Sequence, residues 1–333
     1  MKPLAVSLGD PAGVGPELIC EAWARRVEER LPPFFVGGGA GLLREAARAR
    51  GLGIPIEAVA STADAAQAFA RALPVIGDHD GGYDPGRPDR SGASLALGSL
   101  KEATLLALSG EAGGVVTGPV AKALLAEVGF DFPGQTEFVA RACGVAAEDA
   151  VMMLAGPSLR TVPLTVHVAL AAVPQILSTE LIVRRARIVA EGLRGDFGIR
   201  SPRLAICALN PHAGENGRMG DEEQRIIAPA IATLRSEGIN ASGPHPADSL
   251  FASRARSTYD VAIAMYHDQA LVPLKALDFD RGVNMTLGLP VVRTSPDHGT
   301  AFAIAGKRLA DAGATIAAIR MAGEAAAQRA SCA

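Results

Sequence analysis

Three histidines in this 333-residue chain follow short apolar runs that are typical of strands buried on both faces of a sheet. These runs and the histidines after them are Thr161–Val166 with His167, Leu204–Leu209 with His212, and Val261–Met265 with His267. Runs of this kind alternate with helical patterns along the chain. Such alternation implies mainly parallel sheets covered by helices, so the sequence predicts an α/β fold.

The position of these histidines suggests chemistry. Ligands of open α/β sheets bind beyond the carboxyl ends of the strands. His167, His212 and His267 are half of the six histidines in the chain, and three neutral imidazoles from separate elements suit a divalent metal with open coordination positions. Each histidine alone is more readily explained as a satisfied polar residue at a strand end. Their common placement favours a metal site.

Composition excludes several classes of function. The net charge is −3 and there is no long basic run, which argues against nucleic-acid binding. No apolar stretch approaches the ~18 residues that suggest a membrane span. Cys20 and Cys207 lie in apolar surroundings and no CxxC spacing occurs, which favours reduced cysteines. With no signal peptide after Met1, we expect a cytoplasmic protein.

A glycine-rich turn follows the first predicted strand, Leu4–Leu8. Its residues, Gly9–Glu17, lead into a helical pattern that extends to about Arg30. The turn could bind an anion on its amides or be only a tight turn. It lacks the GxGxxG pattern, and no acidic residue follows the next strand, Pro33–Val36. A nicotinamide cofactor would therefore bind in some way other than the Rossmann mode.

Further polar residues leave two interpretations open. Thr136 could cap a helix or offer its hydroxyl to a ligand. Arg281 and Arg293 could be solvated, or could clamp a phosphate or carboxylate, because a guanidinium binds either group bidentately. Helices are expected from Gln175 to Leu193, and two Ala-rich helices from Ala301 to about Arg329.

Four motifs together resemble the 4-hydroxythreonine-4-phosphate dehydrogenase family of vitamin B6 biosynthesis. They are Gly9–Glu17, Asn210–Glu215, Tyr266–Gln269 and Arg293–Thr300, in the family's order. The resemblance implies two α/β domains around a cleft, as in isocitrate and isopropylmalate dehydrogenases. It also implies a homodimer in which each metal site is shared across the interface.

From this resemblance we expect a first domain of residues 1–135 plus 293–333 on the cofactor side. The second domain, residues 136–292, would carry the metal, the substrate and the dimer contacts. His298, Gly299 and Thr300 are similar to the adenosine-binding loop of the decarboxylating dehydrogenases, which implies NAD or NADP as cofactor.

The resemblance also implies roles for single residues. His167, His212 and His267 would bind one divalent metal ion, Zn, Mg or Co. Thr136, Lys275, Asn284 and Arg293 would contact the phosphorylated substrate. Gln135 stands where the family commonly has histidine, and glutamine can exchange hydrogen bonds there but cannot carry a proton.

The implied reaction is oxidation of 4-phosphooxy-L-threonine at C3, followed by decarboxylation to 3-amino-2-oxopropyl phosphate. The general base would be Lys275 or Asp268, and the sequence leaves both open. Their simpler roles are a fixed positive charge and an orienter of a metal ligand. The alternatives are a dehydrogenase of 4-phospho-threonate or 4-phospho-erythronate, a three-histidine metal hydrolase, and a non-catalytic binding protein.

Overall fold

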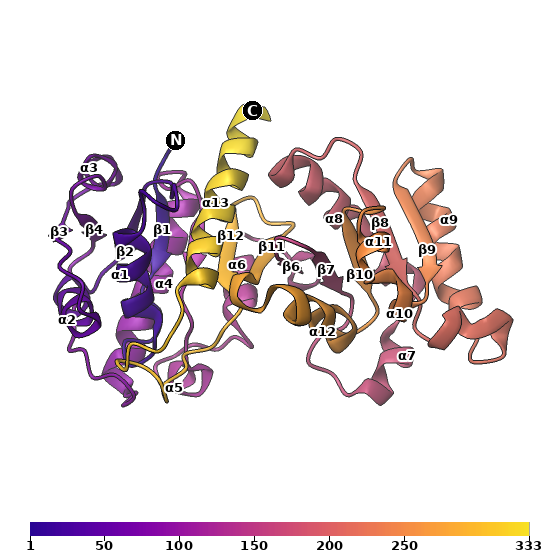
Figure 1. The fold of residues 1–333 in the computed structure, drawn as a ribbon, viewed down its shortest axis with the longest axis horizontal. Coiled ribbons are helices and arrows are strands. Elements are labelled where there is room, and N and C mark those ends of the chain that lie inside the picture. The colour runs from indigo at the N-terminus through magenta and orange to yellow at the C-terminus, as the bar shows by residue number, and fades with distance from the viewer. Residues whose placement is uncertain (333) are drawn as a thin grey trace. The chain divides into compact units, whose positions relative to one another are not determined.

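The computed structural model describes residues 1–332, which form two compact units (Figure 1). The first unit comprises residues 1–147 and 289–331, and the second comprises residues 148–288. The sequence placed these boundaries near 135/136 and 292/293. Helix α6 (Gln135–Ala142) belongs to the first unit because Phe138 packs against a cluster there that includes Leu97, Leu100 and Phe130.

The sheet of the first unit is entirely parallel. Its strands follow the order β3, β4, β2, β1, β5, β12. They are β1 (Leu4–Ser7), β2 (Phe34–Gly37), β3 (Ile56–Ala58), β4 (Leu73–Ile76), β5 (Val115–Thr117) and β12 (Arg293–Pro296). The helices are α1 (Gly15–Ala24), α2 (Ala40–Arg50), α3 (Thr62–Ala68), α4 (Arg90–Leu108), α5 (Lys122–Glu127), α6 and α13 (Gly313–Cys332).

Polar side chains fix where several of these helices begin. Ser61 accepts a hydrogen bond from the amide of Asp64 at 3.1 Å and begins α3, and Asp89 accepts one from Gly92 at 2.7 Å and begins α4. Asp80 does the same for α2 from a distant loop, because its carboxylate accepts from the amides of Gly41 and Leu42. Such caps satisfy amides that have no partner within the helix.

The sheet of the second unit mixes directions. Strands β7, β10, β8 and β9 are parallel neighbours, whereas β6 runs antiparallel to β7 and to β11. The strands are β6 (Val151–Ala155), β7 (Arg160–Pro163), β8 (Arg203–Cys207), β9 (Asn240–His245), β10 (Val261–Ala264) and β11 (Val283–Leu287). The prediction of an α/β fold with mainly parallel strands is confirmed.

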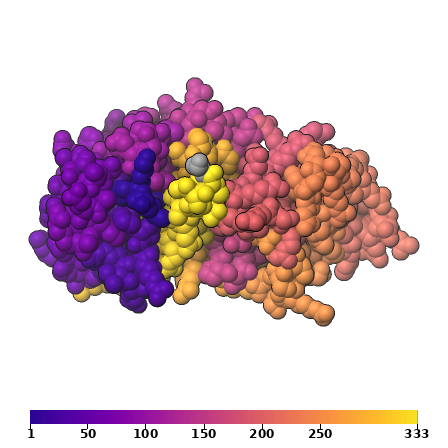
Figure 2. Space-filling view, turned by 90° about the horizontal axis from the view of Figure 1, so that it is seen from above, coloured from indigo at the N-terminus to yellow at the C-terminus, as the bar shows by residue number. Residues whose placement is uncertain are grey.

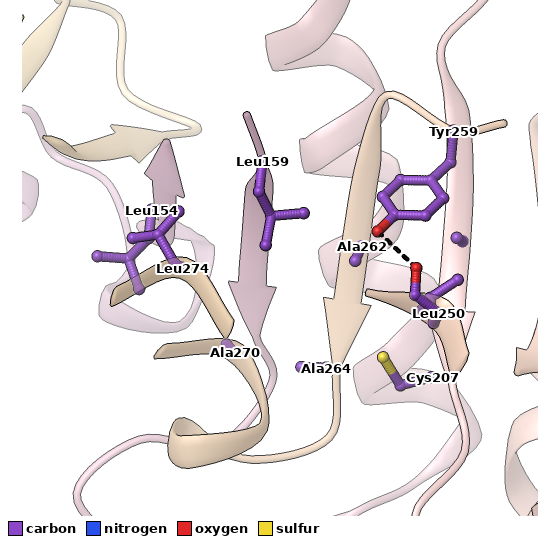
Figure 3. Close-up of a cluster of buried hydrophobic side chains, with 10 residues drawn as sticks. Leu154, Leu159, Cys207, Leu250, Tyr259, Ala262, Ala264, Ala270 and Leu274 are labelled. Carbon is purple, nitrogen blue, oxygen red and sulfur yellow. Dashed lines mark hydrogen bonds between the residues drawn. The ribbon is translucent and has the colours of Figure 1, made fainter. Parts of the chain in front are cut away.

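Helices pack on this second sheet and bury an aliphatic core. They are α7 (Val173–Ile176), α8 (Thr179–Phe197), α9 (Ala228–Ser236), α10 (Ala247–Leu250), α11 (Ser253–Arg256) and α12 (His267–Asp278), with the one-turn elements η1 (Ala147–Asp149, at the boundary with the first unit), η2 (Leu170–Ala172), η3 (Pro211–Gly217), η4 (Glu223–Ile227) and η5 (Phe279–Arg281). Figure 3 shows Ala270 and Leu274 of α12 packed in one cluster with Ala262 and Ala264 of β10. In the same cluster the Tyr259 hydroxyl donates to the Leu250 carbonyl at 3.1 Å, which satisfies a buried polar group.

The helices differ from the sequence expectations at three places. The tail forms one helix, α13, because residues 302–308 make turns instead of a first helix. The helix expected from Gln175 begins instead at Thr179, where the Ser178 side chain caps α8. Lys275 lies inside α12, a helix that the sequence interpretation had not assigned. Pro273 also lies inside this helix, where proline is disfavoured.

Helix α13 ends the chain at the surface of the first unit. Figure 2 shows it in yellow beside the indigo N-terminal segment. Arg320 of α13 donates to the carboxylate of Glu29 at 2.6 Å, and Thr294 of β12 donates to the Ala318 carbonyl at 2.9 Å. These contacts connect α13 to β12 and to the N-terminal part of the same unit.

Within residues 1–332, no helix combines the length and the apolar character that crossing a membrane requires. Cys20 and Cys207 are buried free thiols, as the sequence predicted. Burial raises the pKa of each thiol to about 12, so neither is reactive at neutral pH.

Candidate functional site

Three neighbouring parallel strands lead to the three histidines. Strand β10 lies between β7 and β8 and runs parallel to both, so the carboxyl ends of the three strands meet at one edge of the sheet. His167, His212 and His267 each follow the end of one of these strands within five residues. This is the edge at which α/β proteins bind ligands.

His167 and His267 lie close together. Their ring centroids are 5.8 Å apart, and both line a cavity of about 230 Å³ with Thr165, Tyr266 and Asp268. Since a zinc ion lies about 2.0–2.1 Å from a histidine nitrogen, two rings that share one ion have centroids roughly 5–6 Å apart. The pair therefore fits a shared divalent cation.

Asp268 orients one of these rings. Nδ1 of His267 lies 2.7 Å from Oδ1 of Asp268, the contact of a ring N–H that donates to a carboxylate. This contact leaves Nε2 of His267 to face a ligand. Metal-binding histidines commonly have such a carboxylate partner. The geometry favours the orienting role for Asp268 over that of general base.

The backbone is strained at two of the three histidines. His167 has φ of 54° and His212 has φ of 51°, both in the left-handed region. A residue with a side chain is destabilised there by about 1–2 kcal/mol. Strain of this kind persists where the surroundings impose it and is concentrated at functional sites.

His212 is not brought to the other two rings within the chain. Among residues 1–332, no three side chains of His, Cys, Asp or Glu are grouped so as to hold a metal ion. The cavity beside His167 and His267 has no contribution from His212. A site of three histidines would therefore need a third ligand from outside this chain. A site shared between two copies would provide one.

Lys275 lies away from the histidine pair of its own chain. It is eight residues beyond His267 on α12, which corresponds to roughly 12 Å along the helix axis. Its Nζ is 5.8 Å from the centre of the Phe279 ring, a cation–π contact. His267 and Asp268 follow the end of β10 directly, whereas Lys275 is carried away from that strand end because the intervening residues form a helix.

In the first unit, Arg293 and two threonines form a buried polar cluster. Arg293 is only 3% exposed, and its guanidinium donates to the Thr117 hydroxyl at 2.8 Å and to the Thr136 hydroxyl at 3.1 Å. Burial lowers the pKa of Arg293 to about 10, so the group remains charged at neutral pH. Glu137 interacts electrostatically with this buried guanidinium, and a guanidinium can also bind an anionic ligand such as a phosphate.

Thr136 and Gln135 begin helix α6. Gly134 is the capping residue, so the interpretation of Thr136 as a cap does not hold, and its hydroxyl accepts from Arg293 instead. Gln135 Nε2 donates to the Gly118 carbonyl at 3.1 Å, while its buried Oε1 has no hydrogen-bond donor among residues 1–332. In the second unit, Oδ1 of Asn284 on β11 is likewise buried without a donor from these residues. Such acceptors suit a ligand with hydroxyl or ammonium groups.

The loop that contains His298, Gly299 and Thr300 packs against the glycine-rich turn. The Thr300 carbonyl accepts from the amide of Val14 at 2.9 Å, and a side chain at Gly13 would place Cβ 2.8 Å from that carbonyl. The Gly299 backbone faces open space. Nε2 of His298 is buried and has no hydrogen-bond partner within residues 1–332.

Four backbone amides of the glycine-rich turn donate hydrogen bonds within the protein. Asp10 donates to the Pro119 carbonyl at 2.8 Å, and Ala12 and Gly13 donate to the side chain and carbonyl of Asp10 at 3.0 Å each. Because the Val14 amide is also used, these four amides do not face an anion. The structure supports the tight turn, one of the two interpretations that the sequence left open.

The sequence did not identify two residues that contact proposed site residues, Thr117 in the first unit and Glu223 in the second. Thr117 at the end of β5 contacts Arg293, and its position after an apolar strand was a signal that could have identified it. Glu223 accepts hydrogen bonds from the start of the His212 segment, at the amides of Leu209 and Asn210. Glu223 is the last of three consecutive acidic residues, Asp221–Glu223, at the start of a helical pattern, where carboxylates are usually solvated, so nothing in the sequence distinguished it.

Comparison with known proteins identifies relatives that match over almost the whole chain. The model of the family described as pyridoxal phosphate biosynthetic protein PdxA matches residues 29–322. A protein of Erythrobacter litoralis named 4-hydroxythreonine-4-phosphate dehydrogenase is 62% identical over 329 residues, which cover 99% of this chain and 98% of that protein.

Solved structures are also similar to almost the whole chain. A 4-hydroxythreonine-4-phosphate dehydrogenase from Klebsiella pneumoniae is 36% identical, with a TM-score of 0.87 and 98% of each chain covered. A terephthalate 1,2-cis-dihydrodiol dehydrogenase from Burkholderia xenovorans is 29% identical, with a TM-score of 0.66, and covers 96% of this chain and 97% of its own.

Proposed function

The chain belongs to the PdxA family of pyridoxal phosphate biosynthetic proteins, and from this membership we propose that it oxidises 4-phosphooxy-L-threonine at C3 with NAD or NADP. The product, 2-amino-3-oxo-4-phosphooxybutanoate, is a β-keto acid that loses CO2 to give 3-amino-2-oxopropyl phosphate. Curated relatives over 99% of the chain carry the name of this dehydrogenase. The observation that carries the proposal is the pair of histidine rings, 5.8 Å apart in one cavity beside Asp268.

His167, His212 and His267 would hold a divalent metal, Zn, Mg or Co. The fit of His167 and His267 rests on their ring spacing and on the carboxylate behind His267. When bound, the cation would lower the pKa of the C3 alcohol, and NAD or NADP would accept the hydride. His298, Gly299 and Thr300 are proposed to bind the adenosine part of the cofactor, since the exposed Gly299 leaves room there.

Arg293 and Thr136 are proposed to bind the phosphate of the substrate. The guanidinium is charged, buried and already held by two threonine hydroxyls, so an anion would meet it without reorganisation. Gln135 and Asn284 would accept hydrogen bonds from the hydroxyl and ammonium groups of the substrate. Their buried carbonyl oxygens have no donor among residues 1–332.

The general base remains either Lys275 or Asp268. The base removes the proton from the C3 hydroxyl oxygen as hydride leaves C3. Asp268 is adjacent to His267 and orients it. Lys275 would reach a histidine pair only from another copy, because α12 separates it from the pair of its own chain. A role for Lys275 as the base therefore requires a dimer with shared sites.

A homodimer is therefore part of the proposal. Large apolar side chains of the second unit are exposed: Val168, Leu170 and Ile176 follow β7, Val272 lies on α12, and Phe279 follows that helix. Phe279 is 71% exposed and Leu170 is 65% exposed. Exposed apolar groups of this size commonly mark interfaces.

The decisive assay combines purified protein, 4-phosphooxy-L-threonine and NAD or NADP, with and without a chelator. We expect the reduced nicotinamide to form only when divalent metal is present. Consumption of substrate without reduced nicotinamide would support the metal hydrolase instead. Faster turnover of 4-phospho-threonate or 4-phospho-erythronate, which lack the amino group, would assign the chain to a related dehydrogenase. If none of these substrates is turned over when metal and cofactor are supplied, the chain would be a non-catalytic binding protein.

A further inference from the structure

The segment that carries His212 adopts an unusual backbone. Residues 212–216 all have positive φ, with values of 51°, 53°, 73°, 43° and 58°, so they form a left-handed turn. Only one of the five, Gly214, is a glycine. Side chains crowd the backbone in this conformation, and left-handed residues normally occur singly. Contacts from elsewhere must therefore hold the turn in place.

Glu223 provides such contacts from a separate element. Its side chain is 3% exposed, and it is the first residue of the π-helical turn η4. Its Oε1 accepts hydrogen bonds from the amides of Leu209 at 2.9 Å and Asn210 at 2.8 Å, and its Oε2 accepts from Asn210 Nδ2 at 3.1 Å. Hydrogen bonds to an ionised carboxylate are about twice as strong as neutral ones.

The carboxylate also contacts the middle of the turn. A Cβ at Gly214 would lie 2.5 Å from Glu223 Oε2, so this atom occupies the space that a side chain would need. Glu223 thus contacts the chain both before His212, at Leu209 and Asn210, and after it, at Gly214. A single buried carboxylate fixes the direction in which the left-handed turn leaves β8.

We propose that Glu223 is a positioning residue that sets the orientation of His212 and, through it, the affinity of the metal site. This inference rests on the proposed function, in which His212 is a metal ligand. Glu223 acts through the backbone on either side of His212, and its own carboxylate is fully used by Leu209 and Asn210. Supporting residues of this kind typically change metal affinity about 10- to 100-fold when they are altered.

Glu223→Gln tests the proposal with little change in shape. The amide keeps one acceptor oxygen, so it cannot accept from both backbone amides and from the Asn210 side chain. Calorimetric titration of the metal-free protein with Zn²⁺ or Co²⁺, without substrate or cofactor, should give an affinity about 10- to 100-fold weaker than that of the wild type.

Glu222→Gln is the matched control. Glu222 is the preceding residue, and its Oε2 accepts only from Asn210 Nδ2, at 2.7 Å, without reaching the backbone amides. We expect its metal affinity to be that of the wild type. Should Glu223→Gln fail to fold, Asn210→Ala removes one of the three hydrogen bonds to Glu223 and should weaken metal binding by a smaller factor.

A general loss of stability is separated from positioning by a second control. Asp260→Asn, in the same unit, removes a carboxylate far along the chain from the turn and should lower the melting temperature without changing metal affinity. Equal affinities of the wild type and Glu223→Gln would overturn the positioning role. A wild-type protein that binds neither cation would instead overturn the metal site of the proposed function.

Discussion

Gln135 differs from the histidine that the family resemblance leads one to expect. Its Nε2 donates to Gly118 and its Oε1 is buried without a donor from residues 1–332. An amide has no ionisation near neutral pH, whereas a histidine has an unperturbed pKa of about 6.5. Position 135 can therefore hold a substrate in this chain without exchanging a proton.

Replacing Gln135 with histidine should add an ionisation to the pH profile. A protonated imidazole adds positive charge where a phosphorylated substrate is proposed to bind, so the KM of Gln135→His should fall as the pH drops below about 6.5. The wild type should lack this component. Steady-state kinetics of both proteins across that range provide the measurement, and coincident KM profiles would contradict a substrate contact at position 135.

Arg293→Lys should weaken substrate binding. A lysine cannot donate in parallel to Thr117, Thr136 and a phosphate, because its ammonium is a point charge without the planar fork. Loss of a hydrogen bond to a charged group, at about 1.5–3 kcal/mol, corresponds to a KM raised roughly 10- to 100-fold. Arg281→Lys is the control, since Arg281 is exposed. The proposed phosphate site would be contradicted by equal KM values in the two variants.

At this scale the sequence indicated residue types and strand ends well but side-chain contacts poorly. The position of each histidine after an apolar run was readable, because burial of a parallel strand imposes that run. The pairing of Arg293 with Thr117 was not, since 176 residues separate them along the chain. Arg281 is exposed and Arg293 is buried, so solvation describes Arg281 only, and anion binding by Arg293 stays a proposal.

Among the elements, strands β8 and β10 are held in register by one ion pair. Asp260, directly before β10, accepts from the amide of Arg203 at 2.8 Å and from its guanidinium at 2.9 and 3.1 Å. Hydrogen bonds from Arg203 hold the pKa of Asp260 below its usual value. The pair lies at the amino-terminal starts of both strands, at the opposite ends from those that lead to His212 and His267.

Asp260→Asn should destabilise the protein by about 1–3 kcal/mol near neutral pH. Because the folded pKa is depressed, the stabilisation by Asp260 is present above the unfolded pKa and is lost as the pH falls through the folded value. The difference between wild type and variant in urea unfolding should therefore shrink below about pH 4. A difference that is constant with pH would show that the ionised carboxylate is not the cause.

A helix start and a left-handed turn were not predicted correctly from the sequence. Local caps such as Ser178 were present in the sequence, yet the prediction placed the start of that helix four residues early, at Gln175. The left-handed turn at residues 212–216 could not be anticipated, because four of its five residues are not glycine. Contacts from Glu223 override the local preference there.

For the whole molecule, the incomplete set of histidines is the main consequence of the structure. Two rings are close together within the chain, and no third His, Cys, Asp or Glu side chain of residues 1–332 completes a metal group. Lys275 is also displaced from the pair along α12. A homodimer with shared sites accounts for both observations, as the family resemblance implies.

Leu170→Asp should convert the proposed dimer to a monomer. A carboxylate at a buried apolar position of an interface is costly to desolvate. Leu105→Asp is the matched control, because Leu105 is equally exposed, at 64% against 65%, and lies on α4 of the first unit. Sedimentation velocity should show a dimer for the wild type and the control, and a monomer with weakened metal binding for Leu170→Asp. A wild type that sediments as a monomer would refute the shared site.

The most direct measurement of the central claim is anomalous diffraction from crystals grown with Zn²⁺ or Co²⁺. The account predicts one peak per active site, within about 2.0–2.3 Å of ring nitrogens of His167, His212 and His267, with at least one ring from a second copy. A peak held by other residues, or no peak although the protein oxidises its substrate, would contradict the account.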